Sequence, residues 1–212
     1  MFKERIKQIA SLLKDFHSLV DVGTDHAYLP IYLALNYDYQ NILATDINDG
    51  PLESAKKNIS HYKLDNVIHT LKTDGIEGVD SDYDCLSICG MGGVLIKDIL
   101  ERGIDKLEHF EYILLSPNNN QYYVRKFLAD NGYLIVDEIN IFDQKYYEVI
   151  MAKKVLTKIE YSELELKYGP ILLAQKNDLF VKYYTDQLEH LKSKNSPYLN
   201  DQIEEIKKVL KY

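Results

Sequence analysis

The sequence predicts a doubly wound α/β fold followed by a helical extension. Short apolar runs typical of buried strands alternate with helical patterns, two β-rich runs follow at residues 133–154, and the pattern is purely helical from Tyr161 onward. We therefore expect an α/β domain over residues 1–159 and a coiled-coil-like helical domain over residues 160–212.

Strands and helices take turns along the first domain. It opens with an amphipathic helix expected over residues 1–16, whose apolar residues recur at helical spacing opposite lysine and arginine. Strands are expected at residues 18–23, 41–47, 67–75, 83–90 and 112–118. Helical patterns end near Tyr37 and cover residues 51–64, 93–104 and 121–132. This alternation predicts a parallel sheet with right-handed crossovers.

Residues 133–154 distinguish among parallel-sheet folds. The two β-rich runs join at a short polar turn around Asp143 and Gln144, which predicts an antiparallel hairpin. The sheet then has seven strands and is mostly parallel. Five parallel strands that end in such a hairpin resemble the Rossmann-like fold of class I methyltransferases, whereas a dehydrogenase domain would continue with another parallel unit.

The last 52 residues or so read as helices separated by two breaks. The sequence YGP at 168–170 precedes a helix expected over residues 171–194, and NSP at 195–197 precedes a last helix over residues 198–211. The apolar residues expected to face one another are Leu173, Phe180, Tyr184, Leu188 and Leu191 on the first helix and Leu199, Ile203, Ile206 and Leu210 on the second.

Composition limits the function classes. No run approaches the ~20 apolar residues that span a bilayer, and no signal-peptide pattern is present, so we expect a cytoplasmic protein without a membrane partner. The net charge of −8 argues against the simplest kind of nucleic-acid-binding protein, which has a strongly basic domain. Residues 160–212 hold eight lysines against nine acidic residues, so the excess acid lies mainly in the first domain.

The two cysteines do not indicate a metal site. Cys85 and Cys89 lie in one apolar run, on one face of the expected strand, and two further ligands for a zinc ion are missing. We expect buried free thiols and no bound metal.

Polar residues or glycine end every expected strand. The ligand of a parallel sheet lies outside the carboxyl ends of its strands, near the first strand, so these residues define a pocket. They are Asp21, Gly23, Asp46 with Ile47 and Asn48, Asp74, Gly75, Gly90, Met91, Gly92, Ser116, Pro117 and Asn118.

The turn after the first strand does not suit a polyphosphate. A dinucleotide requires G-x-G-x-x-G, but this turn has Gly23 alone and adds Asp25, which would repel a phosphate, next to His26. An ATP-type loop is absent too. A cationic nucleoside such as S-adenosylmethionine fits better, and Asp21 would either reach its methionine ammonium or tie down the turn.

Two other carboxylates suit the remainder of such a ligand. Asp46 is placed to accept hydrogen bonds from ribose hydroxyls, and Asp74 from an adenine amino group. The alternatives are that Asp46 caps a helix and that Asp74 is a turn residue before Gly75.

The loops after the fourth and fifth strands complete the predicted pocket. The glycines of GMGG at 90–93 let the backbone approach a flat ligand, with Met91 as a soft contact, although a tight turn is the alternative. Asn118 could pair with an adenine edge, or act as a routine turn residue after Pro117.

Several of these segments resemble one family. DVGTDHAYLPIYLA, ATDINDGPLESAKKNI, DGIEG, ICGMGG, SPNNNQYYVRKFLADNGY and the terminal helices are similar to the bacterial tRNA (adenine-22, N1) methyltransferases, across nearly the whole chain. The turn reads Gly-Thr-Asp where Gly-Ser-Asp is expected, which keeps a hydroxyl. The resemblance implies S-adenosylmethionine as cofactor, tRNA as substrate, and a C-terminal domain that helps to hold tRNA.

The implied reaction needs few catalytic groups. Adenine N1 has an in-plane lone pair and no proton, so positioning matters more than a general base. Asp25 is the candidate for stabilising the cationic product, His26 for orienting substrate or methionine, and Asn118 for the base edge. Alternatively, Asp25 or His26 caps the next helix.

The target base must be unpaired or swung out before it can react. The tyrosines expected to stack on it are Tyr28, Tyr122, Tyr123 and Tyr146. The candidates for phosphate contacts are Lys3, Arg5, Lys7, Arg125, Lys126 and the lysines of the tail, unless they form a solvated charged face.

Two other functions remain open from the residues. The negative charge would suit a methyltransferase that acts on another RNA, a protein or a small molecule. A non-catalytic nucleoside-binding or interaction protein is the second alternative. We expect a monomer, with weak self-association through the C-terminal helices as the alternative.

Overall fold

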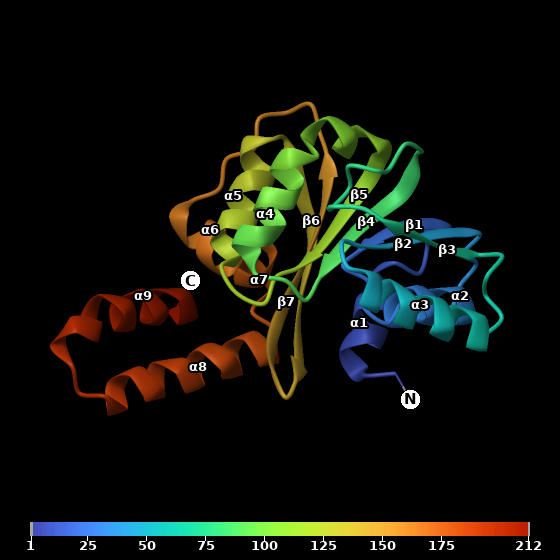
Figure 1. The fold of residues 1–212 in the computed structure, drawn as a ribbon. Helices are drawn as coiled ribbons and strands as arrows, with labels where there is room; N and C mark the ends of the chain where they lie inside the picture. Colours follow the sequence, from blue (N-terminus) through green and yellow to red (C-terminus); the bar gives the residue numbers. More distant parts are fainter. Residues whose placement is uncertain (1, 212) are drawn as a thin grey trace.

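The computed structural model describes residues 2–211 and contains one seven-stranded sheet (Figure 1). The strand order is β3-β2-β1-β4-β5-β7-β6. The strands are β1 (Ser18–Val22), β2 (Asn41–Asp46), β3 (Ile68–Lys72), β4 (Tyr83–Cys89), β5 (Phe110–Ser116), β6 (Tyr133–Asp143) and β7 (Lys145–Lys154). The first five pair in parallel, and β7 pairs antiparallel with both β5 and β6. The predicted fold class, a mostly parallel sheet that ends in an antiparallel hairpin, is confirmed.

Helices cover both faces of the sheet. One core joins a face of the sheet to α4 (Gly93–Arg102), η1 (Ile104–His109) and α5 (Gln121–Asp130). The other core joins the opposite face to α1 (Glu4–Leu12), α2 (Tyr28–Asn36) and α3 (Asp49–His61). Successive strand residues alternate between these cores, as the pleat requires: Leu19 and Val20 are both fully buried, but on opposite faces. This two-sided burial explains why the strands read as continuous apolar runs.

The C-terminal segment differs from the prediction. It contains α6 (Glu163–Tyr168), α7 (Pro170–Gln175), α8 (Asp178–Ser193), η2 (Pro197–Leu199) and α9 (Asn200–Lys211). The single helix predicted over residues 171–194 is wrong, because the backbone turns left-handed at Lys176 (φ 43°) and Asn177 caps a new helix by accepting a hydrogen bond from the Phe180 amide. In Figure 1, α8 and α9 project from the α/β body as an antiparallel pair.

The apolar stripes predicted for these helices are largely confirmed. Phe180, Tyr184, Leu188 and Leu191 of α8 are buried together with Ile206 of α9. Val209, which the prediction omitted, is fully buried in the same core. Leu172 and Leu173 of α7 belong to this core too, so α7 links the projecting pair to the sheet.

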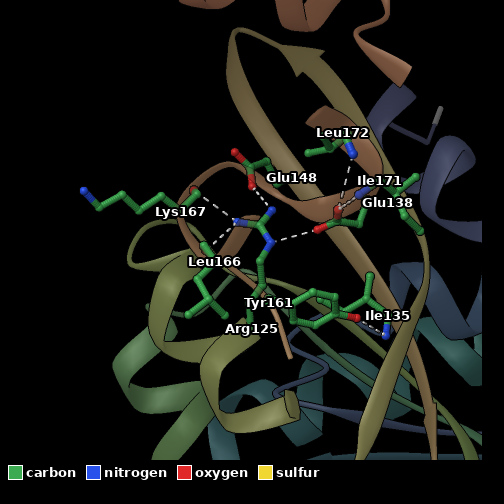
Figure 2. A network of polar contacts seen from close by, with 9 residues as sticks. All are labelled: Arg125, Ile135, Glu138, Glu148, Tyr161, Leu166, Lys167, Ile171 and Leu172. Atoms are coloured by element: carbon green, nitrogen blue, oxygen red, sulfur yellow. Dashed lines mark hydrogen bonds and ion pairs between the residues drawn. The ribbon is translucent and has the colours of Figure 1, made fainter. Parts of the chain in front are cut away.

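A buried ion network joins α6 and α7 to the sheet (Figure 2). Arg125 of α5 donates from Nε to Glu138 of β6 over 2.8 Å and from Nη2 to Glu148 of β7 over 2.5 Å. The side chains of Arg125 and Glu138 are fully buried, and that of Glu148 is 5% exposed. The predicted phosphate contact by Arg125 is therefore wrong, because its guanidinium is enclosed by the protein.

Backbone groups of the tail complete this network. Arg125 also donates to the carbonyl oxygens of Leu166 and Lys167 at the end of α6, while Glu138 accepts from the amides of Ile171 and Leu172 at the start of α7. These are the ends at which helices leave carbonyls and amides unpaired. A cation thus meets the free carbonyls and an anion meets the free amides.

The bend between α6 and α7 requires glycine. Gly169 has φ 90°, and a Cβ there would lie 2.6 Å from Glu138 Oε2 and 2.8 Å from Arg125 Nη2. Neither atom can move away, because both are held in ion pairs. The break predicted from YGP therefore has a second cause, the close approach of the backbone to a buried salt bridge.

We expect Arg125→Met to lower the free energy of unfolding by about 3–5 kcal/mol, because two carboxylates would be left buried without their cation. Urea unfolding at neutral pH would measure it. Lys126→Met is the matched control, since Lys126 is exposed on the same helix and, within residues 2–211, pairs only with Asp130 at i+4. Equal stabilities of the two variants would contradict a structural role for the network.

Candidate active site

The main cavity lies where the chain reverses its direction of strand addition. Strands β1, β2 and β3 are added outward on one side, and β4 then returns to pair with β1. Ligands of doubly wound sheets bind at this switch point, beyond the carboxyl ends of the strands. A cavity of about 650 Å³ lies there, and it is lined from β1, the following turn, β4, α1, α2 and Tyr62.

The cavity brings together some of the predicted residues. Asp21, Gly23, Asp25, His26 and Gly90 line it. Asn118 and the other predicted cofactor residues also lie at the carboxyl ends of strands but do not line the cavity. The cofactor residues outside it are Asp46, Ile47, Asn48, Asp74, Gly75, Met91 and Gly92.

The turn after β1 is held in a strained shape. The amides of Gly23 and Thr24 both donate to the Thr45 carbonyl oxygen over 2.9 Å, which ties the turn to β2. Asp25 (φ 50°) and Ala27 (φ 56°) are left-handed without being glycine. Such conformations cost roughly 1–3 kcal/mol each and cluster at functional sites. Within this turn Thr24 is buried, whereas Asp25 is exposed.

Gly23 is favoured by its left-handed backbone and lies against a neighbour across the sheet. Its φ is 71°, and a Cβ would collide with the methyl group of Met91 from the turn after β4. Met91 packs against the core beside β1, so the two turns are in contact.

Asp25 and His26 are not helix caps. The N-cap of α2 is Ala27, and no side chain accepts a hydrogen bond from the first turn. His26 Nε2 lies 3.7 Å from Asp25 Oδ2, and the His26 carbonyl accepts from Asn58 of α3 over 2.9 Å. Neither side chain is used as a helix cap, and both line the cavity. Pro30 lies in the first turn of α2, which begins at Tyr28.

The two carboxylates outside the cavity have protein partners. Asp46 Oδ1 accepts from the Asn48 amide over 2.9 Å, and α3 has no side-chain cap, so the alternative of Asp46 as a helix cap is wrong. Asp74 accepts from Arg102 Nη2 of α4 over 2.8 Å. This ion pair keeps the Asp74 carboxylate in place beyond the end of β3.

Asn118 joins the loops after β4 and β5. Its amide donates to the Met91 carbonyl over 2.8 Å, and its side-chain Nδ2 donates to the Gly90 carbonyl. These contacts fix the two loops relative to each other. The role of Asn118 toward an adenine edge remains a prediction, with one amide donor already used within the protein.

Sequence reasoning missed the contribution of the N-terminal helix. Phe2, Arg5, Ile6 and Ile9 line the cavity from the α1 side. Helical spacing could have predicted the position of Arg5. It lies one turn before the buried Ile9 and therefore on the same face of α1. Its predicted phosphate role assumed that every charge on this helix faces solvent.

The predicted tyrosines fall into different environments. Tyr28 lines the cavity, is 47% exposed and packs against the His26 ring at 5.2 Å between centroids. Tyr123 is exposed, and Tyr122 donates to Glu163 of α6. Tyr146 is unsuited to stacking on a base because its ring already stacks on Tyr183 of α8, 3.8 Å between centroids.

Asp21 carries a buried carboxyl group. Its side chain accepts a hydrogen bond from Ser87 Oγ over 2.5 Å, and among residues 2–211 it has no cationic partner within ion-pair distance. Burial raises the pKa of Asp21 to about 6, against the lowering effect of the Ser87 hydrogen bond. A buried acid without a counter-ion at the edge of a cavity indicates a functional site.

We expect Asp21→Asn to raise the free energy of unfolding, and more so at pH 7.5 than at pH 5. The pKa is raised on folding, so ionisation disfavours the folded state, and this penalty grows as pH rises from 3.8 through about 6. The penalty approaches about 3 kcal/mol at pH values above that range. Urea unfolding of both proteins at the two pH values would measure it, and a pH-independent difference would contradict this account.

Both cysteines are free, as predicted. Cys85 is buried, whereas Cys89 is half-buried and lines the cavity. Burial raises the pKa of the Cys89 thiol to about 12, so it is not a nucleophile at neutral pH. Within residues 2–211, no cluster of His, Cys, Asp or Glu could hold a metal ion, and no helix is long and apolar enough to cross a membrane.

Comparison with known proteins gives consistent matches over most of the chain. The family model described as tRNA (adenine(22)-N(1))-methyltransferase matches residues 19–211. The Bacillus subtilis tRNA (adenine(22)-N(1))-methyltransferase is 35% identical over 196 residues, which are 90% of this chain and 82% of that protein.

Solved structures agree over the whole fold. A Streptococcus pneumoniae putative tRNA (m1A22) methyltransferase in complex with S-adenosyl-L-methionine has a TM-score of 0.91 at 32% identity, covering 99% of this chain and all of that one. M. capricolum TrmK in complex with S-adenosyl-homocysteine has a TM-score of 0.86 at 28% identity, covering 100% and 98%. With the fold, the switch-point cavity and these matches in agreement, the chain belongs to the tRNA (adenine(22)-N(1))-methyltransferase family.

Proposed function

We propose that the protein transfers the methyl group of S-adenosylmethionine to N1 of adenine 22 in tRNA. The observation that carries this proposal is the family match over residues 19–211, which covers the sheet, except for the first residue of β1, and the C-terminal helices. The Bacillus subtilis relative is named for this specificity, and two of the solved structures contain the cofactor or its product.

The cofactor lies across the carboxyl edge of the sheet in this proposal. Asp46 binds the ribose hydroxyls and Asp74 accepts from the adenine amino group, with Ile47, Asn48 and Gly75 beside them. Gly23 and the turn at Gly90, Met91 and Gly92 allow the backbone to approach the ligand closely. The Arg102 ion pair supports this role for Asp74, since it orients the carboxylate beyond the end of β3.

The chemistry requires orientation rather than proton removal. Adenine N1 attacks the sulfonium methyl group with its lone pair, and the base becomes cationic as the bond forms. Asp25 stabilises that charge from the cavity mouth, and His26 orients the substrate. The Asp25 side chain is 70% exposed, so its electrostatic contribution is modest, because water screens exposed charges.

The tRNA approaches the cavity mouth with its target base swung out of the stack. Tyr28 is the tyrosine best placed to stack on that base, because it lines the cavity and is 47% exposed. The projecting pair α8 and α9 contacts the remainder of the tRNA. A tRNA substrate implies a cytoplasmic location, and one chain suffices for the reaction.

Methyl transfer to tRNA tests the function directly. We expect label from S-adenosylmethionine to enter a tRNA with adenine at position 22 and to be absent from the same tRNA with guanine there. Mass spectrometry would map the methylated nucleotide. Equal labelling of both tRNAs, or labelling of proteins instead, would refute the proposal.

The role of the projecting helices has its own test. Lys192 and Lys194 at the end of α8 are exposed, and neither forms an ion pair within residues 2–211. We expect Lys192→Gln/Lys194→Gln to raise KM for tRNA several-fold and to reduce the salt dependence of binding by a slope of about 1–2, because two phosphate contacts are lost. The affinity for S-adenosylmethionine should not change.

Lys182→Gln is the matched control on the same helix, since Lys182 is engaged with Asp186. An unchanged KM and salt slope in the double variant would exclude these lysines from the interface. Substitution is preferable to deletion of residues 161–212, because residues 166–172 cover the buried charges of Arg125 and Glu138.

A further inference from the structure

The hairpin of β6 and β7 extends beyond the carboxyl edge of the parallel strands. Strand β7 pairs with β5 as far as Leu115, which lies opposite Ile150, whereas its pairing with β6 continues to Asp143, opposite Lys145. The hairpin therefore runs on for about five residues, roughly 17 Å, past its last pair with β5. Gln144 closes the turn with φ 64°. In Figure 1 this turn extends past the ends of the neighbouring strands.

The tip of the hairpin shares its edge of the sheet with the candidate active site. Strand β7 is antiparallel to both β5 and β6, so β6 ends at the same edge as β5. Tyr147, near the tip, packs its ring against the guanidinium of Arg5, 3.9 Å from the ring centroid, and Arg5 lines the cavity. A substrate much larger than one nucleotide can therefore contact the tip while it occupies the cavity.

Phe142 places an exposed aromatic ring at this tip. All six phenylalanines lie within residues 2–211; five are buried or half-buried, and Phe142 is 62% exposed. It belongs to none of the three apolar cores formed by the described residues. The fold therefore gains little from this side chain. Since single exposed apolar residues are common on protein surfaces, its surroundings must decide whether it has a role.

The hairpin face that carries Phe142 is fixed to the start of α8. Phe142 lies opposite Tyr146 in the strand register, so both side chains are on the same face. The Tyr146 ring stacks on Tyr183 of α8, with 3.8 Å between centroids and 9° between planes, and Tyr184 packs edge-on against Tyr183. Phe142 is therefore held on a braced strand, in the corner where the hairpin tip and the projecting helices meet.

An exposed aromatic ring on a rigid strand is the arrangement with which proteins stack on unpaired bases, because every base has a π-face. We propose that the hairpin tip is a contact surface for tRNA, and that Phe142 stacks on one of its unpaired bases. The inference rests on the proposed function. It adds to that function a contact outside both the cavity and the pair α8 and α9.

The stacked base is not the target adenine. Strand β6 lies three strand spacings from β4, roughly 14 Å, and Phe142 is also displaced beyond the strand ends. The cavity into which the target adenine is swung lies at β1 and β4. Phe142 therefore contacts a different nucleotide and helps to place the tRNA relative to the cavity.

The charges at the tip favour stacking over a phosphate contact or a protein partner. Asp143 is half-buried and Lys145 is exposed, so the turn has no net charge, whereas a phosphate contact would require an excess of cations. The three residues that follow Phe142, at 143–145, are polar. The tip thus lacks the continuous apolar patch that would mark a surface for a protein partner.

The composition of the chain allows a direct test. The protein contains no tryptophan, so Phe142→Trp introduces a single fluorophore at the tip. We expect its emission to be quenched when tRNA binds, because the indole stacks on a base, and to be unchanged by an RNA duplex of similar length without unpaired bases. Leu134→Trp is the matched control, since Leu134 is 36% exposed near the opposite end of the same strand, and its emission should not change with either RNA.

Kinetics would measure the contribution of the stack. We expect Phe142→Ala to raise KM for tRNA about 5- to 100-fold, the usual effect of losing one base–aromatic stack, without changing kcat or the affinity for S-adenosylmethionine. Phe142→Tyr should keep the KM of the unmodified protein, whereas Phe142→Leu, which is apolar but not flat, should behave like Phe142→Ala. The salt dependence of binding should be equal in all of them, because no phosphate contact is lost.

The outcomes separate this inference from the proposed function. Unquenched emission of Phe142→Trp with tRNA bound, or an unchanged KM in Phe142→Leu, would overturn the stacking contact. A smaller salt slope in Phe142→Ala would assign the tip to a phosphate and overturn it as well. The fluorescence depends on binding alone, so it decides the role of Phe142 whether or not a methyl group is transferred. Absence of methyl transfer to tRNA by the unmodified protein would refute the proposed function instead.

Discussion

The ion pairs of Arg125 with Glu138 and Glu148 are the constraint on which the arrangement of the whole molecule depends. They connect α5, both strands of the hairpin and the two short helices of the tail in one buried network. Apolar residues could fill this volume with similar stability, but they would accept several orientations of the tail, whereas charges and backbone dipoles at fixed angles accept one. The helix that carries Arg125 begins at Gln121, shortly after Asn118, so the same helix adjoins both the buried network and the edge of the candidate site.

The carboxyl edge owes its shape to contacts between loops that are distant in sequence. The turn after β1 is hydrogen-bonded to the Thr45 carbonyl of β2 and contacts Met91 in the loop after β4. That loop is in turn joined to the loop after β5 through Asn118. Each loop is thereby fixed by its neighbours, which is what a reaction governed by orientation requires. The N-terminal helix closes the remaining side, with Arg5 stacked on Tyr147 of the last strand pair.

Local patterns were sufficient to predict the sheet, and distant contacts explain what they missed. Burial on both faces of a strand, helical spacing and a polar hairpin turn can each be recognised from a few consecutive residues. The reaction was predicted from the family resemblance. The break at Lys176 was missed because apolar spacing continues across it. Arg125 lies among the apolar residues Val124, Phe127 and Leu128, yet its partners are 13 and 23 residues away, so no short window could identify them.

The same limit applies to the candidate site. Parallel strands end at one edge, so the polar residues that follow them could be grouped without a structure. Which of those side chains line the cavity and which are engaged by the protein, as Asp74 is by Arg102, depends on packing between helices. The buried carboxylate of Asp21 shows what this implies for evolution. A neutral residue there would give a sturdier protein, so selection for stability alone would remove Asp21; its retention would record selection for the ligand, and searches for stabilised variants should leave this position unchanged.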